Sequence, residues 1–84
     1  MNIIIQDNTT YNTKLLYGNN IAYIEVGDDF IKFYFNNYLA PIKFKGYEDV
    51  VAAAARVIQQ ELLHGTTTVD LSTYELYESK KEAN

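Results

Sequence analysis

Apolar and polar residues alternate in short runs along the first half of the chain, and this spacing predicts β-strands. In the clearest run, residues 30–35, Ile31 and Phe33 would share one face and Lys32 and Tyr34 the other. Comparable runs cover residues 2–6, 11–17, 21–26 and 38–45. Turn-forming residues separate these runs, and because the links are short we expect neighbouring strands to pair antiparallel, as a meander of four to five strands.

The apolar spacing changes to the helical period over about residues 47–64. Glu48 and Asp49 would lie in the first turn, where carboxylates suit the positive end of the helix dipole. His64 falls in the last turn, and Gly65 follows as a typical end signal. The apolar stripe of this helix would consist of Tyr47, Val51, Ala54, Ala55, Ile58 and Leu62. We expect one long helix packed across one face of the sheet.

The last part of the chain gives two alternatives. Residues 66–71 alternate as a strand does, and Ser72-Thr73-Tyr74-Glu75 matches a helix-capping pattern. The pattern favours a short helix over residues 73–81, whereas the alternative extends the strand through Tyr77. Either way, the sequence predicts an α+β fold in a single domain of residues 1–84.

Composition limits the classes of function. The chain has 84 residues and no cysteine, and His64 is its one histidine, so we expect no metal site and no cofactor. The longest apolar run is residues 50–55, which is too short for a transmembrane helix, and we expect a cytoplasmic protein. Eight Tyr, eight Ile and eight Asn point to codons rich in A and T, as in a bacterial or viral genome of low G+C content.

Residues suited to catalysis are scarce. His64 would cap a helix, and Ser72 and Ser79 lie in no nucleophile motif. The carboxylate pairs at residues 28–29 and 48–49 are explained by a solvated turn and a helix start. The glycines form no phosphate-binding loop. We therefore expect a protein that is not an enzyme.

Charge is unevenly distributed: residues 1–47 are neutral, and residues 48–84 carry the whole net charge of −4. A negative field of this kind could occupy the basic nucleic-acid groove of another protein. The sequence thus favours a small acidic inhibitor of a nucleic-acid-processing protein, such as a phage-encoded inhibitor of a host or defence protein. The candidate partner-binding residues are Asp49, Glu61, Asp70, Glu75, Glu78 and Glu82.

Aromatic residues suggest a second surface. If the helix covers one sheet face, the other face carries Tyr23, Phe30, Lys32, Tyr34, Lys43 and Lys45. Such a face is compatible with ordinary cross-strand packing. It also fits the alternative function of a self-assembling structural or accessory domain that forms a homodimer through this face, because Tyr is enriched in interfaces. Base stacking on single-stranded nucleic acid is a third reading, which the net charge and the single arginine, Arg56, argue against.

Overall fold

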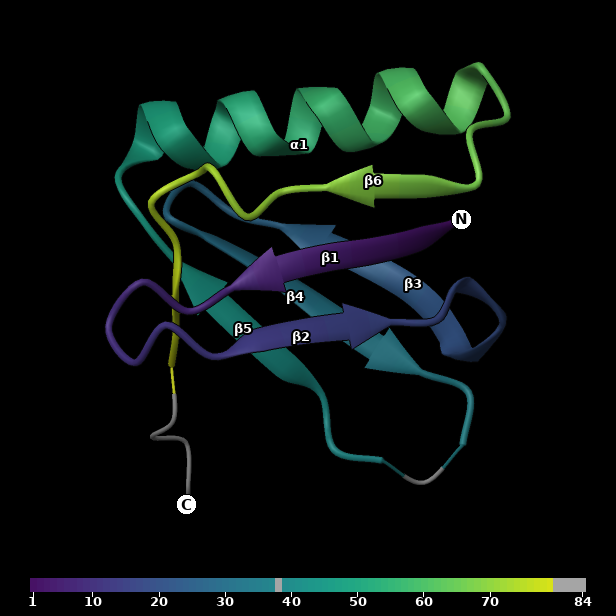
Figure 1. The fold of residues 1–84 in the computed structure, drawn as a ribbon, viewed down its shortest axis with the longest axis horizontal. Helices are drawn as coiled ribbons and strands as arrows, with labels where there is room; N and C mark the ends of the chain where they lie inside the picture. Colours follow the sequence, from purple (N-terminus) through teal and green to yellow (C-terminus); the bar gives the residue numbers. More distant parts are fainter. Residues whose placement is uncertain (38, 80–84) are drawn as a thin grey trace.

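The computed structural model describes residues 1–37 and 39–79 and shows an α+β fold in which one long helix packs against two sheets (Figure 1). The three-stranded sheet contains β1 (Asn2–Gln6), β2 (Thr13–Leu16) and β6 (Thr68–Asp70). The four-stranded sheet contains β3 (Ile21–Val26), β4 (Phe30–Phe35), β5 (Ile42–Lys45) and β7 (Tyr77–Glu78). Helix α1 is Glu48–Leu63. The predicted α+β class, the antiparallel strands, the long helix and the C-terminal strand are confirmed.

The strands are divided between two sheets, which differs from a single continuous meander. Within the four-stranded sheet, β3, β4, β5 and β7 pair antiparallel in that order. Strand β1 pairs antiparallel with β2 and parallel with β6. The meander therefore runs through β3, β4 and β5, and β1 takes one partner from the far end of the chain.

The change of sheet occurs where a hairpin turn was predicted. Residues Gly18–Asn20 form a short 3-10 helix, η1, which carries the chain from β2 to β3. The Gly18 N–H donates to the Asn2 side-chain oxygen at 2.8 Å. A Cβ on Gly18 would lie 2.3 Å from the Met1 carbonyl oxygen, so only glycine fits this close approach.

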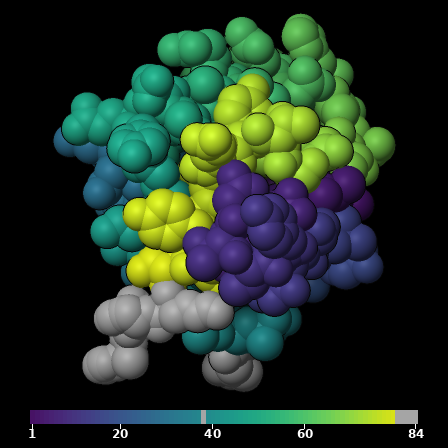
Figure 2. Space-filling view, turned by 60° about the vertical axis from the view of Figure 1, so that its left-hand side comes forward, coloured from purple at the N-terminus to yellow at the C-terminus, as the bar shows by residue number. Residues whose placement is uncertain are grey.

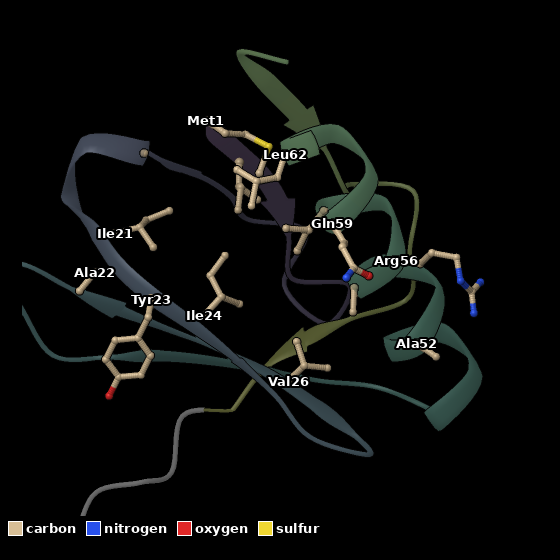
Figure 3. Close-up of a pocket in the computed structure, with 14 residues that line it drawn as sticks. Met1, Ile21, Ala22, Tyr23, Ile24, Val26, Ala52, Arg56, Gln59 and Leu62 are labelled. Carbon is tan, nitrogen blue, oxygen red and sulfur yellow. The ribbon is translucent and has the colours of Figure 1, made fainter. Parts of the chain in front are cut away.

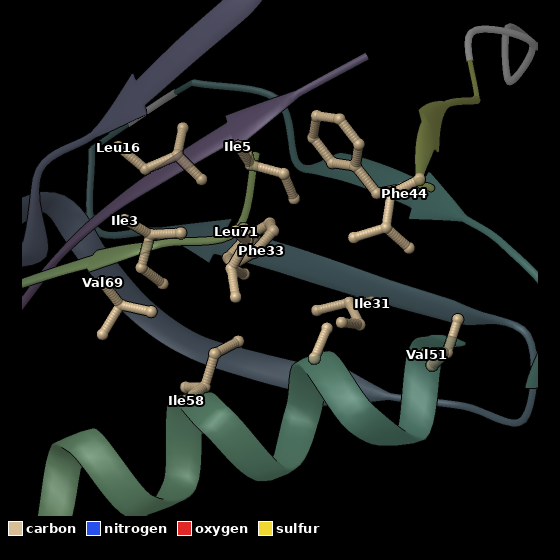
Figure 4. Packing of buried hydrophobic residues seen from close by; sticks show 12 residues of the cluster. Ile3, Ile5, Leu16, Ile31, Phe33, Phe44, Val51, Ile58, Val69 and Leu71 are labelled. Carbon is tan, nitrogen blue, oxygen red and sulfur yellow. The ribbon is translucent and has the colours of Figure 1, made fainter. Parts of the chain in front are cut away.

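The core lies between α1 and the inner faces of both sheets, as Figure 4 shows. Because β4 alternates, Ile31 and Phe33 point into it, and the Phe33 and Phe44 rings meet edge to face at 6.4 Å. The other buried apolar residues are Ile3, Ile5, Leu16, Val51, Ala54, Ile58, Val69, Leu71 and Leu76.

Helix α1 buries the middle of its predicted stripe and exposes the two ends. Val51, Ala54 and Ile58 are buried, whereas Tyr47 and Leu62 are 76% and 62% exposed. Tyr47 precedes the first helical turn with extended backbone (φ −66°, ψ 153°), and Leu62 lies in the last turn. The helix ends as predicted, with His64 at its C-cap and Gly65 at φ 72°.

The favoured short helix after Ser72 is absent from residues 72–79, and residues 80 and 81 lie outside the described chain. The Ser72 side chain does not cap a helix, because both its hydroxyl and its N–H donate to Asp70. The chain instead makes a turn, buries Leu76 completely and enters β7 beside β5. The alternative prediction, a strand extended through Tyr77, agrees with the structure only in that Tyr77 lies in a strand.

Candidate functional site

All six residues of the predicted Tyr/Lys face lie on the outer face of the four-stranded sheet. The strand register places Tyr23 opposite Tyr34, Lys32 opposite Lys43, and Phe30 opposite Lys45. Tyr23 lies on this face by the regular register of residues 23–26, and the register shift between Ile21 and Tyr23 places Ile21 opposite Phe35 and against the core.

The aromatic rings of this face are occupied by their own neighbours. Tyr23 and Tyr34 stack with ring centroids 4.3 Å apart. The Lys32 ammonium lies 5.1 Å from the Tyr34 ring, and the Lys43 ammonium lies 4.7 Å from the Phe30 ring. The Tyr34 hydroxyl donates to Glu25 at 2.8 Å, and this hydrogen bond raises the pKa of Tyr34. The rings of Tyr23, Tyr34 and Phe30 and the Tyr34 hydroxyl therefore already have contacts within the chain.

The six candidate acidic residues do not share one surface. Asp49 and Glu61 lie in the first and last turns of α1, about 18 Å apart along the helix axis. Glu78 forms an ion pair with Lys14 at 3.6 Å. Asp70 accepts two hydrogen bonds from Ser72, which lower its pKa. Glu82 lies outside the described residues.

The structure brings two of the predicted residues, Asp49 and Glu75, together with three that were not predicted. We call this set the acidic end: Asp28, Asp29, Glu48, Asp49 and Glu75. The Gly46 N–H donates to the Asp29 carbonyl at 3.0 Å, which ties the β3–β4 turn to the start of α1. The Glu75 carbonyl oxygen lies 3.1 Å from where a Cβ of Gly46 would be. All five side chains are exposed, and within the described chain only Asp29 has an ion-pair partner, Lys45 at 3.9 Å.

Beside these carboxylates lies a hollow of about 570 Å³, which we call the tyrosine hollow. Its lining is Asn8, Tyr11, Gly46, Tyr47, Glu75 and Tyr77. Figure 2 shows the segments that form it side by side: the loop after β1 in purple, the start of α1 in teal and the C-terminal segment in yellow. Tyr11, Tyr47 and Tyr77 are 73%, 76% and 45% exposed, so three large rings surround the hollow without entering the core.

Hydrogen bonds of the loop after β1 hold one wall of the hollow. Asp7 is only 3% exposed, and its carboxylate accepts from the Thr9 N–H at 2.8 Å. The Tyr11 N–H donates to the Asp7 carbonyl at 2.6 Å, and Tyr11 adopts φ 64°. The Asn8 N–H donates to the Leu76 carbonyl at 2.9 Å, which joins the loop to the segment that carries Glu75. Tyr11 therefore lies in a fixed loop and not in the strand predicted over residues 11–17.

Sequence reasoning missed the tyrosine hollow because its residues come from three distant segments. One local signal was available: Tyr47 directly precedes the two acidic residues of the first helical turn, at a position outside the helix. The predicted stripe placed Tyr47 in the core on helical spacing alone.

The side chains of this site are suited to binding a cationic group. Carboxylates and phenol rings together suit guanidinium and ammonium groups, through charge-assisted hydrogen bonds and cation–π contacts. Among residues 1–37 and 39–79, no three His, Asp or Glu residues come together as a metal site would need. In the same part of the chain, no helix is long and apolar enough to cross a membrane. No family model, curated protein or solved structure matches this chain.

Proposed function

We propose that this protein is a binding domain without enzymatic activity, and that its acidic end docks onto a basic surface of a protein partner. The observation that carries the proposal is the tyrosine hollow next to five exposed carboxylates. Tyr is enriched at the energetic centres of interfaces, and a centre needs a pocket in which an anchor can be desolvated. An arginine of the partner, stacked between the rings with its guanidinium toward Glu75, is the anchor that this lining suits best.

The charge at this end supports a partner that normally binds nucleic acid. Five carboxylates against Lys45 leave a local charge of −4 on one end of the molecule. Such a field attracts the basic groove of a nuclease, polymerase or defence complex and competes there with DNA or RNA. The proposed role is therefore inhibition by occupation of a nucleic-acid groove, as a phage-encoded inhibitor would act.

The outer sheet face gives weaker support for the alternative functions. Its rings are stacked on each other or covered by Lys32 and Lys43, so a dimer or a nucleic acid would have to displace contacts that already exist. Among the described residues, the carboxylates of the acidic end have one ion pair to break, Asp29 with Lys45.

The test is capture of binding proteins from the lysate of a bacterial host by the tagged chain, with elution by excess DNA and separately by high salt. We expect a DNA-handling protein that both treatments release, because DNA competes for the same groove and salt screens the charges. Glu75→Lys should abolish capture. Glu61→Lys is the matched control, because it makes the same charge change in the last turn of α1, far from the hollow, and should leave capture intact. Glu61 is half-buried and accepts a hydrogen bond from the Thr66 hydroxyl, so circular dichroism should check that this variant folds.

An arginine-rich peptide serves as a defined probe of the hollow. Tyr47→Ala should weaken its binding about fivefold, which corresponds to about 1 kcal/mol for one cation–π contact.

The capture test has one outcome that would refute the proposal. If Glu61→Lys and Glu75→Lys reduce partner capture equally, only net charge matters, and the proposal of a specific acidic end is wrong.

A further inference from the structure

A second surface, independent of the acidic end, lies along the open edge of β3. Within residues 1–37 and 39–79, strand β3 has one hydrogen-bonded neighbour, β4, and forms one edge of the four-stranded sheet. The Gly27 N–H donates to the Phe30 carbonyl at 2.9 Å, which sets the alternation of hydrogen bonds in this hairpin. By that alternation, the N–H and C=O groups of Ile24 and Val26 point away from β4 toward the open edge.

From Tyr23 to Val26 this edge lacks the usual protection against strand pairing. Exposed edges are commonly blunted by lysine, proline, a bulge or very short length, and the register shift of β3 lies before Tyr23. The other edge of the sheet, β7, has only two residues. Strand β3 has six residues, no proline and no lysine, and Glu25 is its single charged residue.

An apolar groove of about 770 Å³ runs beside the edge, between β3 and α1 (Figure 3). It exists because α1 packs mainly over β4 and β6 and leaves the inner side of β3 partly uncovered, with Ile24 half-buried and Val26 exposed. Ile24 and Val26 line the groove from the strand, and Ile58 and Leu62 line it from the helix. Val26 is 49% and Leu62 62% exposed, a large apolar exposure for side chains that line one groove.

We propose that a second copy of this chain occupies this edge, with the two β3 strands paired antiparallel about a two-fold axis at Ile24. In this register Ile24 lies opposite the partner's Ile24 on the groove side. Tyr23 lies opposite the partner's Glu25 on the outer side, in a pair where side chains approach closely. The carboxylate of Glu25 accepts one bond from Tyr34 and has lone pairs left for the partner's Tyr23 hydroxyl.

A second copy fits better than a foreign strand because the surface complements itself. A two-fold interface uses the same patch on both subunits and closes the assembly after two copies. It would pair both open β3 edges in one step, joining two four-stranded sheets into one with a short β7 at each end. Both grooves then meet across the axis, so Val26 and Leu62 of each copy are covered by apolar atoms of the other.

The size of the surface predicts a modest affinity. Fourteen residues line the groove, whereas a standard stable interface uses about 20–30 residues on each side. The dimer should therefore form reversibly with concentration.

Sedimentation of the full chain over a wide range of concentration tests the proposal. The mass should rise from 9.7 kDa toward twice that value. Val26→Lys should leave a monomer, because it places a charge in the groove on the open edge. Val26→Thr keeps the branched shape and the N–H, and should still dimerise. Because Val26 is half-exposed, both variants should fold, which circular dichroism will check.

Amide hydrogen exchange gives a test that needs no variant. The N–H groups of Ile24 and Val26 should exchange quickly in dilute solution and become protected as the mass increases. A chain that stays monomeric at every concentration overturns the proposal. So does a dimer that survives Val26→Lys and is lost on Tyr34→Glu, because that result places the interface on the outer Tyr/Lys face.

Discussion

The contact between Gly46 and Leu76 allows a quantitative test of how the acidic end is built. A Cβ on Gly46 would lie 2.9 Å from Leu76 Cδ2 and 3.1 Å from the Glu75 carbonyl oxygen. Gly46 is not in the left-handed region, so the cost of Gly46→Ala comes from crowding and not from backbone strain. Overpacking of this kind costs about 1–3 kcal/mol of the free energy of unfolding. Leu76 is completely buried, and Leu76→Ala should cost about 3 kcal/mol through the cavity it leaves.

The two changes should compensate each other when combined. The cavity left by Leu76→Ala includes the space that the new methyl group of Gly46→Ala needs. We therefore expect the double variant to be about 1 kcal/mol more stable than the sum of the single changes predicts. The rescue should be partial, because the Glu75 carbonyl is backbone and stays in place.

Urea unfolding followed by circular dichroism measures the three variants against the parent chain. Ile58→Ala provides the control for coupling, because Ile58 is buried further along α1, about 15 Å from the helix start. Its combination with Gly46→Ala should be additive. If the pair Gly46→Ala and Leu76→Ala is also additive, Leu76 does not pack on Gly46. The placement of Glu75 and Tyr77 beside Tyr47 would then be wrong.

Three further predictions concern single positions. Gly65→Ala should cost about 1 kcal/mol in unfolding experiments, because Gly65 holds φ 72° in open space. Ser72→Ala should raise the pKa of Asp70 in an NMR titration. Because Asp70 has a lowered pKa in the folded chain, its stabilising effect is present above its ordinary value of 3.8 and is lost as the pH falls through the folded pKa. Glu25→Gln should lower the pKa of Tyr34 in a tyrosinate absorbance titration. Because Glu25 raises that pKa, its contribution is present below pH 10.0 and is lost as the pH rises through the folded pKa.

The spacing of apolar residues correctly predicted β4 and α1, because in each of them the buried face follows from the element's own residues. The alternation in β4 was sufficient because one face of that strand is buried, and the helix was marked by its apolar period and by Gly65. The Tyr/Lys face followed from the same alternation, since a strand presents every second residue to one side.

The division into two sheets could not be read from local patterns. Strand β1 takes β6 as its parallel partner, and no nearby turn specifies a pairing between segments so far apart. The segment after Ser72 was misjudged for a related reason. Burial of Leu76, which depends on the folded chain, outweighs the helix-capping pattern. The two hydrogen bonds that Ser72 donates to Asp70 are local, and one of them occupies the Ser72 hydroxyl that the capping pattern would have used. The acidic end is also tertiary, because its carboxylates come from three segments joined at Gly46.

The two proposed surfaces are compatible on electrostatic grounds and respond differently to salt. Asp28 and Asp29 follow Val26 after one residue, Gly27, so antiparallel pairing of two β3 strands points the two acidic ends in opposite directions. Charges separated by more than about 10 Å are largely screened in ordinary buffer, so repulsion between the acidic ends should not prevent the dimer. Rising salt should therefore leave the dimer intact, because its groove is apolar, while it releases a basic partner from the acidic end. A dimer that dissociates in salt together with the partner would mean that one charged surface serves both associations, and the assignment of the second copy to the β3 edge would fail.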